Sequence, residues 1–289
     1  MAPRVIILGS GTPAPDMGRW GSSFLVGIGG DWMMFDCGFA ATYKLYKAGF
    51  KATQVDHLFF THHHSDHDAD YPAFLLTRFD MSIGKENELR VYGPTLTEQL
   101  TERLLGEGVG AFWHDIVART NHPLSLGAYV ERGGKLPRRP PKIHARDIGP
   151  GTVATGKHWE ITAARVEHVQ PYLDSLAYRI DSDEGSIVFS GDTRPCASLT
   201  NLAKDADLLV MECIRLSSEQ KGLATETSET GSYGAGETAR DAGVKRMVLV
   251  HQRPEMDEPV RHAQALHEVK SVYDGPVIWG DELLEVPWE

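Results

Sequence analysis

Short apolar runs separated by glycine-containing turns occupy the first third of the chain, and this pattern is typical of β-strands. The expected strands are 5–8, 23–28, 32–35 and 55–60. The pair Gly29-Gly30 separates the second run from the third and predicts a hairpin. Apolar residues at helical spacing predict helices at 41–48, at 71–79 and from about 94 to 105.

The last part of the chain returns to the same alternation. The expected strands are 159–166, 176–180, 186–189, 208–211, 246–250 and 276–279, and the expected helices are 236–242 and 260–269. In both halves the strands come first and the helices follow them. This order predicts an α+β fold in which two sheets pack on each other and the helices cover the outside.

The stretch 106–150 has few apolar runs and contains the pairs Gly133-Gly134 and Pro140-Pro141. We expect a surface insertion within a single domain spanning 1–289. Its basic residues are Arg132, Lys135, Arg138, Arg139, Lys142 and Arg146. These residues suit phosphate groups, but a solvated loop or a subunit contact, and hence a homodimer, is the favoured interpretation. Phe112 and Trp113 suit either stacking on a flat ring or anchoring in the core.

The composition excludes several classes of protein. With 41% hydrophobic and 24% charged residues among 289, the chain is expected to be globular. The net charge of −11 disfavours a protein that coats nucleic acid through bulk charge. Three cysteines imply no disulfide framework, so a reducing, cytoplasmic location is expected. The apolar runs are too short for a membrane span or a signal peptide.

Histidines gather directly after the strand expected at 55–60. In an extended segment His62 and His64 point to the same side, so both imidazoles reach one ion. Asp66 and His67 follow a turn and are placed to serve a second ion. Imidazole and carboxylate ligands suit zinc and related metals. The alternative is a polar loop, in which these histidines, like His63, bind no metal.

Further residues of the same chemical types follow other expected strands. His168, Asp192 and His251 each lie just past an apolar run, where a sheet presents side chains to a shared crevice. Together with the histidine group they favour a metal site over separate structural roles. His144 and Asp147 form a weaker pair, for which the hypotheses are a third, peripheral metal ion at a subunit contact and the structural role that is usual for an isolated pair.

These motifs together resemble the metallo-β-lactamase superfamily. The pattern comprises His62-x-His64-x-Asp66-His67, His168, Gly191-Asp192-Thr193 and His251, with residues 9–13 and 35–38 matching as well. The resemblance implies an αββα sandwich with a site for two zinc ions at one edge of the sheets. It implies that one zinc binds His62, His64 and His168. The other zinc would bind Asp66, His67 and His251, and Asp192 would bridge the two ions.

The positive charge of two zinc ions exceeds the combined negative charge of Asp66, Asp192 and a bridging hydroxide. Such a site keeps water as hydroxide near neutral pH, because zinc lowers the pKa of water to about 7. Asp66 and Asp192 are therefore expected to be catalytic as well as ligands. Asp36 and Asp70 are candidates to orient ligand imidazoles, with turn residues as the equal alternative.

Within this superfamily residues 177–180, 191–195 and 242–246 resemble the ribonuclease Z-like branch. The sequence departs from the tRNA-processing enzymes in two places. Their His-Glu-Ala-Thr motif is here Met211-Glu212-Cys213-Ile214, which leaves Glu212 as a catalytic candidate without its histidine. Their His-Ser-Thr segment is replaced around 229–233, which contains no histidine. With the net charge, these departures disfavour nucleic acid as a partner.

Residues 59–68, 71–78, 84–87 and 136–141 resemble chlorothalonil hydrolytic dehalogenases. That resemblance implies hydrolytic removal of chloride from a chlorinated aromatic nitrile, a step in which the leaving group needs no proton. We therefore expect a zinc-dependent hydrolase that acts on a small halogenated aromatic. The alternatives on the same site are a phosphodiesterase or ribonuclease Z-like nuclease and a lactone or ester hydrolase. A binding protein without activity is a further alternative, disfavoured by the apparently complete ligand set.

Overall fold

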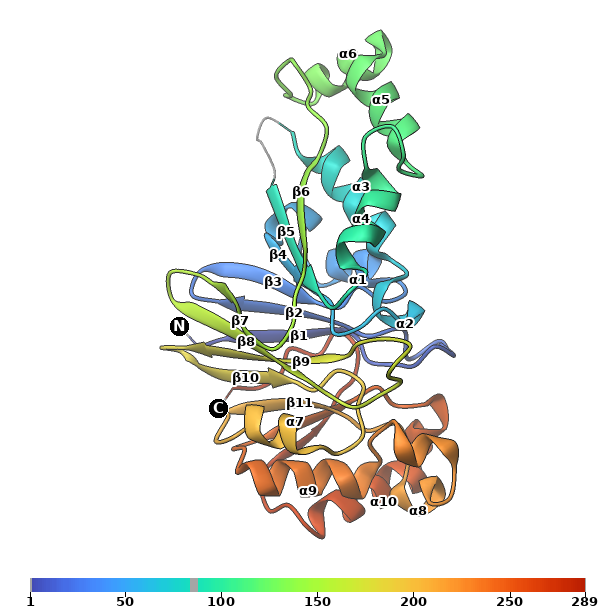
Figure 1. The fold of residues 1–289 in the computed structure, drawn as a ribbon, viewed down its shortest axis with the longest axis vertical. Coiled ribbons are helices and arrows are strands. Elements are labelled where there is room, and N and C mark those ends of the chain that lie inside the picture. Colours follow the sequence, from blue (N-terminus) through green and yellow to red (C-terminus); the bar gives the residue numbers. More distant parts are fainter. Residues whose placement is uncertain (1, 84–87, 289) are drawn as a thin grey trace.

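The computed structural model describes residues 2–83 and 88–288, so the 84–87 motif lies outside the described residues. Two β-sheets pack against each other, and helices lie on the outer side of each (Figure 1). Helices α1, α3 and α4 cover the first sheet, and α7, α9 and α10 cover the second (Figure 1). The predicted αββα sandwich is therefore confirmed.

The first sheet has the strand order β1-β2-β3-β4-β5-β6. Its strands are β1 Arg4–Gly9, β2 Ser23–Ile28, β3 Asp31–Phe35, β4 His57–Phe59, β5 Glu88–Gly93 and β6 Lys142–Asp147. Strands β2 and β3 form the predicted hairpin, whose turn residues Gly29 and Gly30 both have positive φ. From β3 to β6 the pairing is parallel, so the carboxyl ends of β3 and β4 lie at one edge of the sheet.

The second sheet has the order β13-β12-β11-β10-β9-β8-β7. Its strands are β7 Gly151–Thr155, β8 Trp159–Arg165, β9 Leu176–Ser182, β10 Gly185–Phe189, β11 Leu208–Glu212, β12 Met247–Val250 and β13 Val277–Trp279. Strands β10 to β13 are parallel, and their carboxyl ends meet at one edge. Short polar segments leave that edge after β10 and β12, where the sequence predicts ligand residues.

The helices are α1 Ala41–Lys47, α2 Ser65–Asp68, α3 Tyr71–Met81, α4 Thr97–Leu105, α5 Trp113–Asn121, α6 Pro123–Glu131, α7 Ala197–Leu202, α8 Ser217–Gln220, α9 Ser232–Ala242 and α10 Pro259–Lys270. Short 3₁₀ turns lie at Ala52–Gln54, Ala224–Thr227 and Pro254–Asp257. Helix α9 begins earlier than predicted because Gly234 and Gly236 hide the apolar spacing of its first turns. Among the described residues no helix is long and apolar enough to cross a membrane.

Aromatic rings join the two sheets directly below the edge that carries the histidines. The Phe35 ring at the end of β3 stacks on Phe189 at the end of β10, with 4.4 Å between centroids. On its own sheet Phe35 also stacks on Phe59, at 5.0 Å. All three rings are buried, so apolar burial fixes the separation of the sheets where the polar residues meet.

The segment 106–150 differs from the predicted surface loop. It contains the helix pair α5 and α6, which lies at the end of the molecule farthest from the second sheet (Figure 1). It also contains β6, which pairs with β5 as the last strand of the first sheet. Ile116 is fully buried, and Phe112 and Trp113 pack against the same apolar cluster beneath the first sheet. Both aromatic residues are therefore anchors of the helix pair.

We expect Phe35→Ala to lower the free energy of unfolding by about 3–5 kcal/mol, because it leaves a cavity between the sheets. The measurement is denaturant unfolding of metal-free protein, so that ion binding does not contribute. The matched control is Tyr43→Ala on α1, whose side chain is 64% exposed and whose loss should change stability by less than about 0.5 kcal/mol. Equal effects of the two substitutions would contradict this account of the core.

Candidate metal centre

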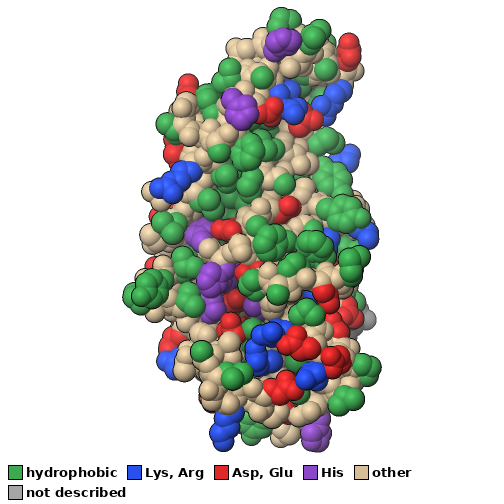
Figure 2. Space-filling view, turned by 90° about the vertical axis from the view of Figure 1, so that its right-hand side faces the viewer, with side chains coloured by type: hydrophobic (Ala, Val, Ile, Leu, Met, Phe, Trp, Pro, Cys, Tyr) green, Lys and Arg blue, Asp and Glu red, His purple; other side chains and the backbone are tan. Residues whose placement is uncertain are grey.

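Two groups of ligand-type side chains meet at the shared edge of the two sheets. The first comprises His62, His64, His168 and Asp192, and the second comprises Asp66, His67, Asp192 and His251. Within each group the ligand atoms lie within 4.8 Å of one another. Asp192 belongs to both groups, so the two sites are adjacent. Figure 2 shows histidine side chains gathered in the middle of one face of the molecule.

Strand ends bring these residues together from distant parts of the chain. His62 and His64 follow β4, and the short helix α2 carries Asp66 and His67. In the second sheet, the remaining three follow strand ends: His168 comes after β8, Asp192 after β10 and His251 after β12. His251 has a φ of 59°, a strained conformation for a side chain of this size. The backbone there is held so that the imidazole turns toward the first sheet.

In the first group the imidazole nitrogens face one another at distances suited to a shared ion. The Nδ1 atom of His64 lies 3.0 Å from Nε2 of His62 and 3.2 Å from Nε2 of His168. The Asp192 carboxylate lies 3.7 Å from Nε2 of His62. Nitrogen atoms arranged in this way have room for a metal ion between them, because zinc–nitrogen bonds are about 2.0–2.1 Å long.

In the second group two carboxylates face two imidazoles. His251 Nε2 lies 3.1 Å from Asp66 Oδ2 and 3.2 Å from Asp192 Oδ2. His67 Nε2 lies 3.3 Å from Asp192 Oδ1 and 3.6 Å from Asp66 Oδ2. All four side chains are buried, so the group would leave several polar atoms without partners if nothing bound between them.

Unpaired polar atoms support metal binding at this edge. The Oδ1 atom of Asp66 and Nε2 of His67 are buried and have no hydrogen-bond partner. Buried polar atoms normally have one, so unpartnered atoms within a ligand cluster support a site that binds an ion. Imidazole and carboxylate are also the donor types that first-row metal ions take. The two groups therefore suit a dinuclear metal site.

The protonation states of the two groups differ in the metal-free protein. Burial and the nearby His67 keep the pKa of His62 well below its usual value. Burial and His168 likewise lower the pKa of His64. Burial would also lower the pKa of His67, but the carboxylates of Asp192, Asp36 and Asp66 outweigh it and raise that pKa well above its usual value. The pKa of His251 is raised in the same way, with Asp192 and Asp66 outweighing burial.

Asp36 holds the His67 ring from behind. Its Oδ2 accepts a hydrogen bond of 2.8 Å from His67 Nδ1. Its Oδ1 accepts one of 2.7 Å from the Thr61 amide, and the Thr61 hydroxyl donates to Oδ2 at 2.8 Å. The carboxylate thereby leaves Nε2 of His67 as the nitrogen free for an ion. Asp70, the other candidate for this role, instead accepts a hydrogen bond from the Thr42 amide and joins α1 to α3.

Glu212 lies at the end of β11, behind the second group. Its Oε2 accepts a hydrogen bond of 2.7 Å from the Thr193 amide, and its Oε1 lies 3.9 Å from His251 Nδ1. Burial and the negative charge of Asp192 raise the pKa of Glu212 well above its usual value. The side chain therefore holds the backbone beside Asp192, and its Oε1 faces His251 without a hydrogen bond.

The backbone near the centre is packed too tightly for side chains. A Cβ atom at Gly38 would lie 2.0 Å from the carbonyl oxygen of Asp66, and one at Gly21 would lie 2.4 Å from it. The Cys37 amide donates a hydrogen bond to the carbonyl of His67. The loops before α1 therefore hold α2, and with it Asp66 and His67, against the first sheet.

Among the described residues, the two groups do not include His63, which was not predicted to bind metal, or the predicted pair His144 and Asp147. His63 faces away from them and contacts Asp68 at 3.2 Å and Thr97 at 2.8 Å. The carboxylate of Asp147 accepts hydrogen bonds from the amides of Leu96 and Glu98 at the start of α4. The His144 ring lies 3.7 Å from Glu88.

Sequence reasoning missed the contacts that fix the ligands from outside. Thr61 precedes His62 and could have been found as a polar residue at a buried strand end. Ser228 offers its backbone carbonyl to His168 Nδ1 at 2.8 Å, a contact with no signal in residue type. Glu229, the next residue, has a buried Oε2 atom without a hydrogen-bond partner. Burial and the charge of Asp192 raise its pKa to about 7.

Comparison with known proteins identifies the family of the chain. Residues 19–223 match the family described as "Metallo-beta-lactamase superfamily". Ribonuclease Z of Mycobacterium sp. (strain KMS) is 30% identical over 287 residues, which cover 98% of this chain and 95% of the relative. Ribonuclease Z of Mycobacterium avium (strain 104) is 32% identical over 291 residues, with 98% and 97% covered.

Two solved structures share the fold. The metallo-beta-lactamase fold protein YhfI from Bacillus subtilis has a TM-score of 0.75 at 20% identity, with 99% of each chain covered. Human tRNase Z, short form, has a TM-score of 0.68 at 19% identity, again with 99% of each chain covered. At these identities the structural likeness establishes the fold alone.

The comparisons overturn two expectations. The prediction of a hydrolytic dehalogenase acting on a halogenated aromatic is wrong, because the full-length relatives are named Ribonuclease Z. Of the motifs behind it, 71–78 lies on α3, whose Tyr71, Phe74 and Leu75 are core residues. Motif 136–141 lies in the segment before β6. Neither motif contains a residue of the two ligand groups.

Nucleic acid was also wrongly disfavoured as a partner, since the full-length relatives are named Ribonuclease Z. The net charge of −11 is a sum over the whole chain and does not describe the surface beside the site. Figure 2 shows Asp and Glu as well as Lys and Arg side chains near the histidines on that face, so the charge there is mixed.

Metal loading at neutral pH should release protons, because His67 and His251 have raised pKa values and must be neutral to bind metal. The apparent metal affinity should therefore rise with pH. Titration calorimetry in two buffers of different ionisation enthalpy measures the release, and His63→Ala should release as many protons as the wild type. Equal observed enthalpies in both buffers would contradict the protonated metal-free state.

Asp36→Asn should weaken metal binding by about 10- to 100-fold, because an amide no longer fixes the ring of His67 as a carboxylate does. Competition with a fluorescent chelator measures the affinity. Asp70→Asn is the matched control, since Asp70 bonds to the Thr42 amide, and it should bind metal as the wild type does. Similar losses in both variants would mean that the effect is general destabilisation.

Proposed function

The chain belongs to the metallo-β-lactamase superfamily and to its ribonuclease Z-like branch, and we propose that it is a metal-dependent ribonuclease that hydrolyses phosphodiester bonds in RNA of the tRNA type. The relationship supports a metal-dependent hydrolase. The observation that carries the RNA substrate is the identity of 30% over 98% of the chain to proteins named Ribonuclease Z. The likeness thus includes both halves of the site.

We propose two Zn²⁺ ions as the resident metals. Bound ions of this kind activate water and polarise a phosphoryl oxygen. One ion would be held by His62, His64 and His168, and the other by Asp66, His67 and His251. The Asp192 carboxylate faces imidazoles of both groups, which supports its role as the bridging ligand. A third ion at His144 and Asp147 is not part of this proposal.

The protein's own residues position these ligands before a substrate arrives. Asp36 and Thr61 fix the His67 ring, and the Ser228 carbonyl fixes His168. Glu212 holds the backbone beside Asp192. We therefore assign Glu212 a positioning role rather than direct contact with the phosphate. Preorganisation of this kind lowers the cost of stabilising charge in the transition state.

Phosphodiester cleavage expels an alkoxide, which needs a proton. The motifs at 211–214 and 229–233 contain no histidine that could provide it. We assign that proton to Glu229. Its backbone is held between Ser228, which contacts His168, and Thr230, whose hydroxyl donates to the Thr193 carbonyl. The segment thus spans both ligand groups, and the unpartnered Oε2 of Glu229 is the atom that would donate.

The zinc identity, the homodimer and the cytoplasmic location remain predictions from the sequence. So does a single domain spanning 1–289. Of these predictions, the identity of the metal is the one that bears directly on activity. Metal analysis of the purified protein tests it.

Metal-loaded protein should cleave a precursor tRNA transcript and bis(p-nitrophenyl) phosphate, and a chelator should stop both reactions. Asp192→Asn should reduce both rates to background, because it removes the carboxylate common to the two groups. His63→Ala is the control, since His63 lies outside both groups, and it should remain active. Turnover of lactones or esters with no cleavage of RNA would refute the proposed substrate.

Glu229→Gln should lower kcat for the transcript by about 10²-fold or more, with little change in KM, because general acid catalysis acts on the transition state. Bis(p-nitrophenyl) phosphate should be affected far less, since nitrophenolate leaves without a proton. Glu226→Gln, an exposed carboxyl in the same loop, should behave as the wild type. Equal losses on both substrates would show that Glu229 acts only structurally.

A further inference from the structure

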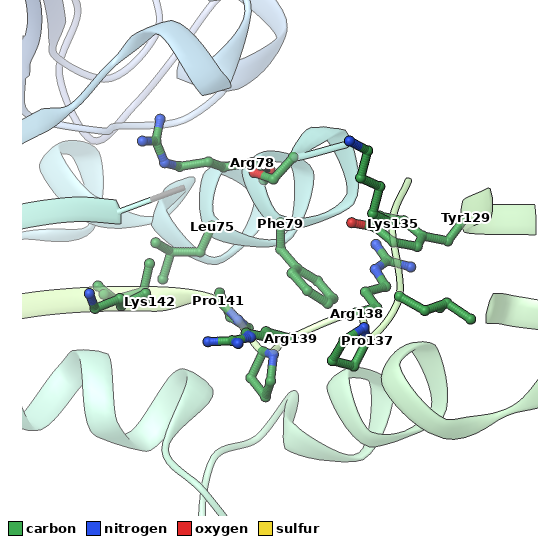
Figure 3. Close-up of a pocket in the computed structure, with 14 residues that line it drawn as sticks. Leu75, Arg78, Phe79, Tyr129, Lys135, Pro137, Arg138, Arg139, Pro141 and Lys142 are labelled. Carbon is green, nitrogen blue, oxygen red and sulfur yellow. Dashed lines mark hydrogen bonds between the residues drawn. The ribbon is translucent and has the colours of Figure 1, made fainter. Parts of the chain in front are cut away.

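A cavity of about 490 Å³ lies between α3, α6 and the segment that leads into β6. Pro137, Pro140 and Pro141 form part of its wall, which makes that part of the backbone stiff. Figure 3 shows Phe79 of α3 facing the segment that carries Arg138, with Tyr129 of α6 beside it. None of the lining residues belongs to the metal-ligand groups.

The lining is basic in a chain whose net charge is −11. Its described members include five cations and no carboxylate, the cations being Arg78, Lys135, Arg138, Arg139 and Lys142. Two of them are occupied elsewhere: Arg78 donates to backbone carbonyls such as that of Ala52, and Lys142 pairs with Glu88. Of the other lining cations, Lys135 and Arg138 can reach a ligand in the cavity.

Arg138 is held as a fixed donor. Its side chain is 5% exposed, and its guanidinium lies 4.5 Å from the centroid of Phe79 and 4.8 Å from that of Tyr129. Among the described residues its one hydrogen bond goes to Asp80, at 3.2 Å. A guanidinium has five N–H donors, so most of those on Arg138 have no described partner.

Asp80 does not neutralise the cluster. Its carboxylate also binds Arg119 at 2.9 Å and Arg132 at 3.0 Å, so one negative charge is shared among three guanidinium groups. Among the described residues, only Arg119 of these three has a second carboxylate partner, Asp115, at 2.7 Å. Positive charge therefore remains in excess beside the cavity, and an anion would reduce it.

We propose that this cavity binds a phosphate ester of nucleotide size, through Arg138 and Lys135, at a site separate from the metal centre. The volume lies within the range of small-molecule sites. Arginine and lysine are the side chains that bind phosphate oxygens, arginine through paired hydrogen bonds. The proposal does not depend on the ribonuclease function, because none of the metal ligands takes part in it.

The experiment is titration calorimetry of the full chain with ADP, both metal-loaded and after chelation. ADP should bind saturably in both states, and adenosine, which lacks phosphate, should not bind. Lys135→Glu should weaken ADP binding by about tenfold or more by replacing attraction with repulsion, whereas Lys135→Arg should retain it. The matched control is Lys157→Glu, an exposed lysine in the turn between β7 and β8, which should leave binding unchanged.

Inorganic phosphate and a short single-stranded RNA identify the source of the phosphate group. If the RNA binds more tightly than ADP and Lys135→Glu weakens RNA binding, the cavity recognises a phosphate of an RNA strand. That result would still support the proposed site. ADP binding that disappears on chelation, or that Lys135→Glu leaves unchanged, would overturn the proposal. Equal weakening of ADP binding by Lys157→Glu would also overturn the proposal, because such a result would mean that ADP responds to the overall charge of the protein alone.

Discussion

The contact between Asp192 and imidazoles from both sheets is the constraint on which the site depends. The carboxylate lies 3.7 Å from His62 and 3.3 Å from His67, which belong to the first sheet. It lies 3.2 Å from His251, which belongs to the second. These distances require the two sheets to pack in one relative position. The stack of Phe35 on Phe189, immediately below, sets that position by burying apolar rings.

Burial then determines the chemistry of the polar side chains above this stack. Away from water, an imidazole beside several carboxylates gains a proton, and one beside other imidazoles loses it. His67 and His62 are the two cases, and they lie close together in the same buried cluster. In the second group the carboxylates of Asp66 and Asp192 balance the protonated imidazoles of His67 and His251. Bound metal ions would take the place of those protons.

The sequence predicted the site better than the periphery, for a physical reason. Residues His62, Asp192 and His251 follow buried strands, and apolar alternation reveals where such strands end. Helices α5 and α6 have no comparable signal, because among their residues only Ile116 and Tyr129 are buried. Strand β6 has exposed and half-buried positions only, so it lacks an apolar run. The substrate was predicted wrongly because net charge and motifs such as 136–141 carry no information about one edge of the sheets. Motif 59–68 does lie at that edge, but it holds metal ligands, which do not by themselves select a substrate.

The close approach of Gly21 and Gly38 to the carbonyl of Asp66 bears on how this centre tolerates change. Neither residue has an atom that could bind metal, yet a single methyl group on either would displace a ligand-bearing helix. The residues that must stay unchanged for the site to form thus include more than its ligands. Attempts to transplant the centre into another scaffold, or to diversify this one, must keep glycine at these two positions as strictly as they keep the histidine ligands.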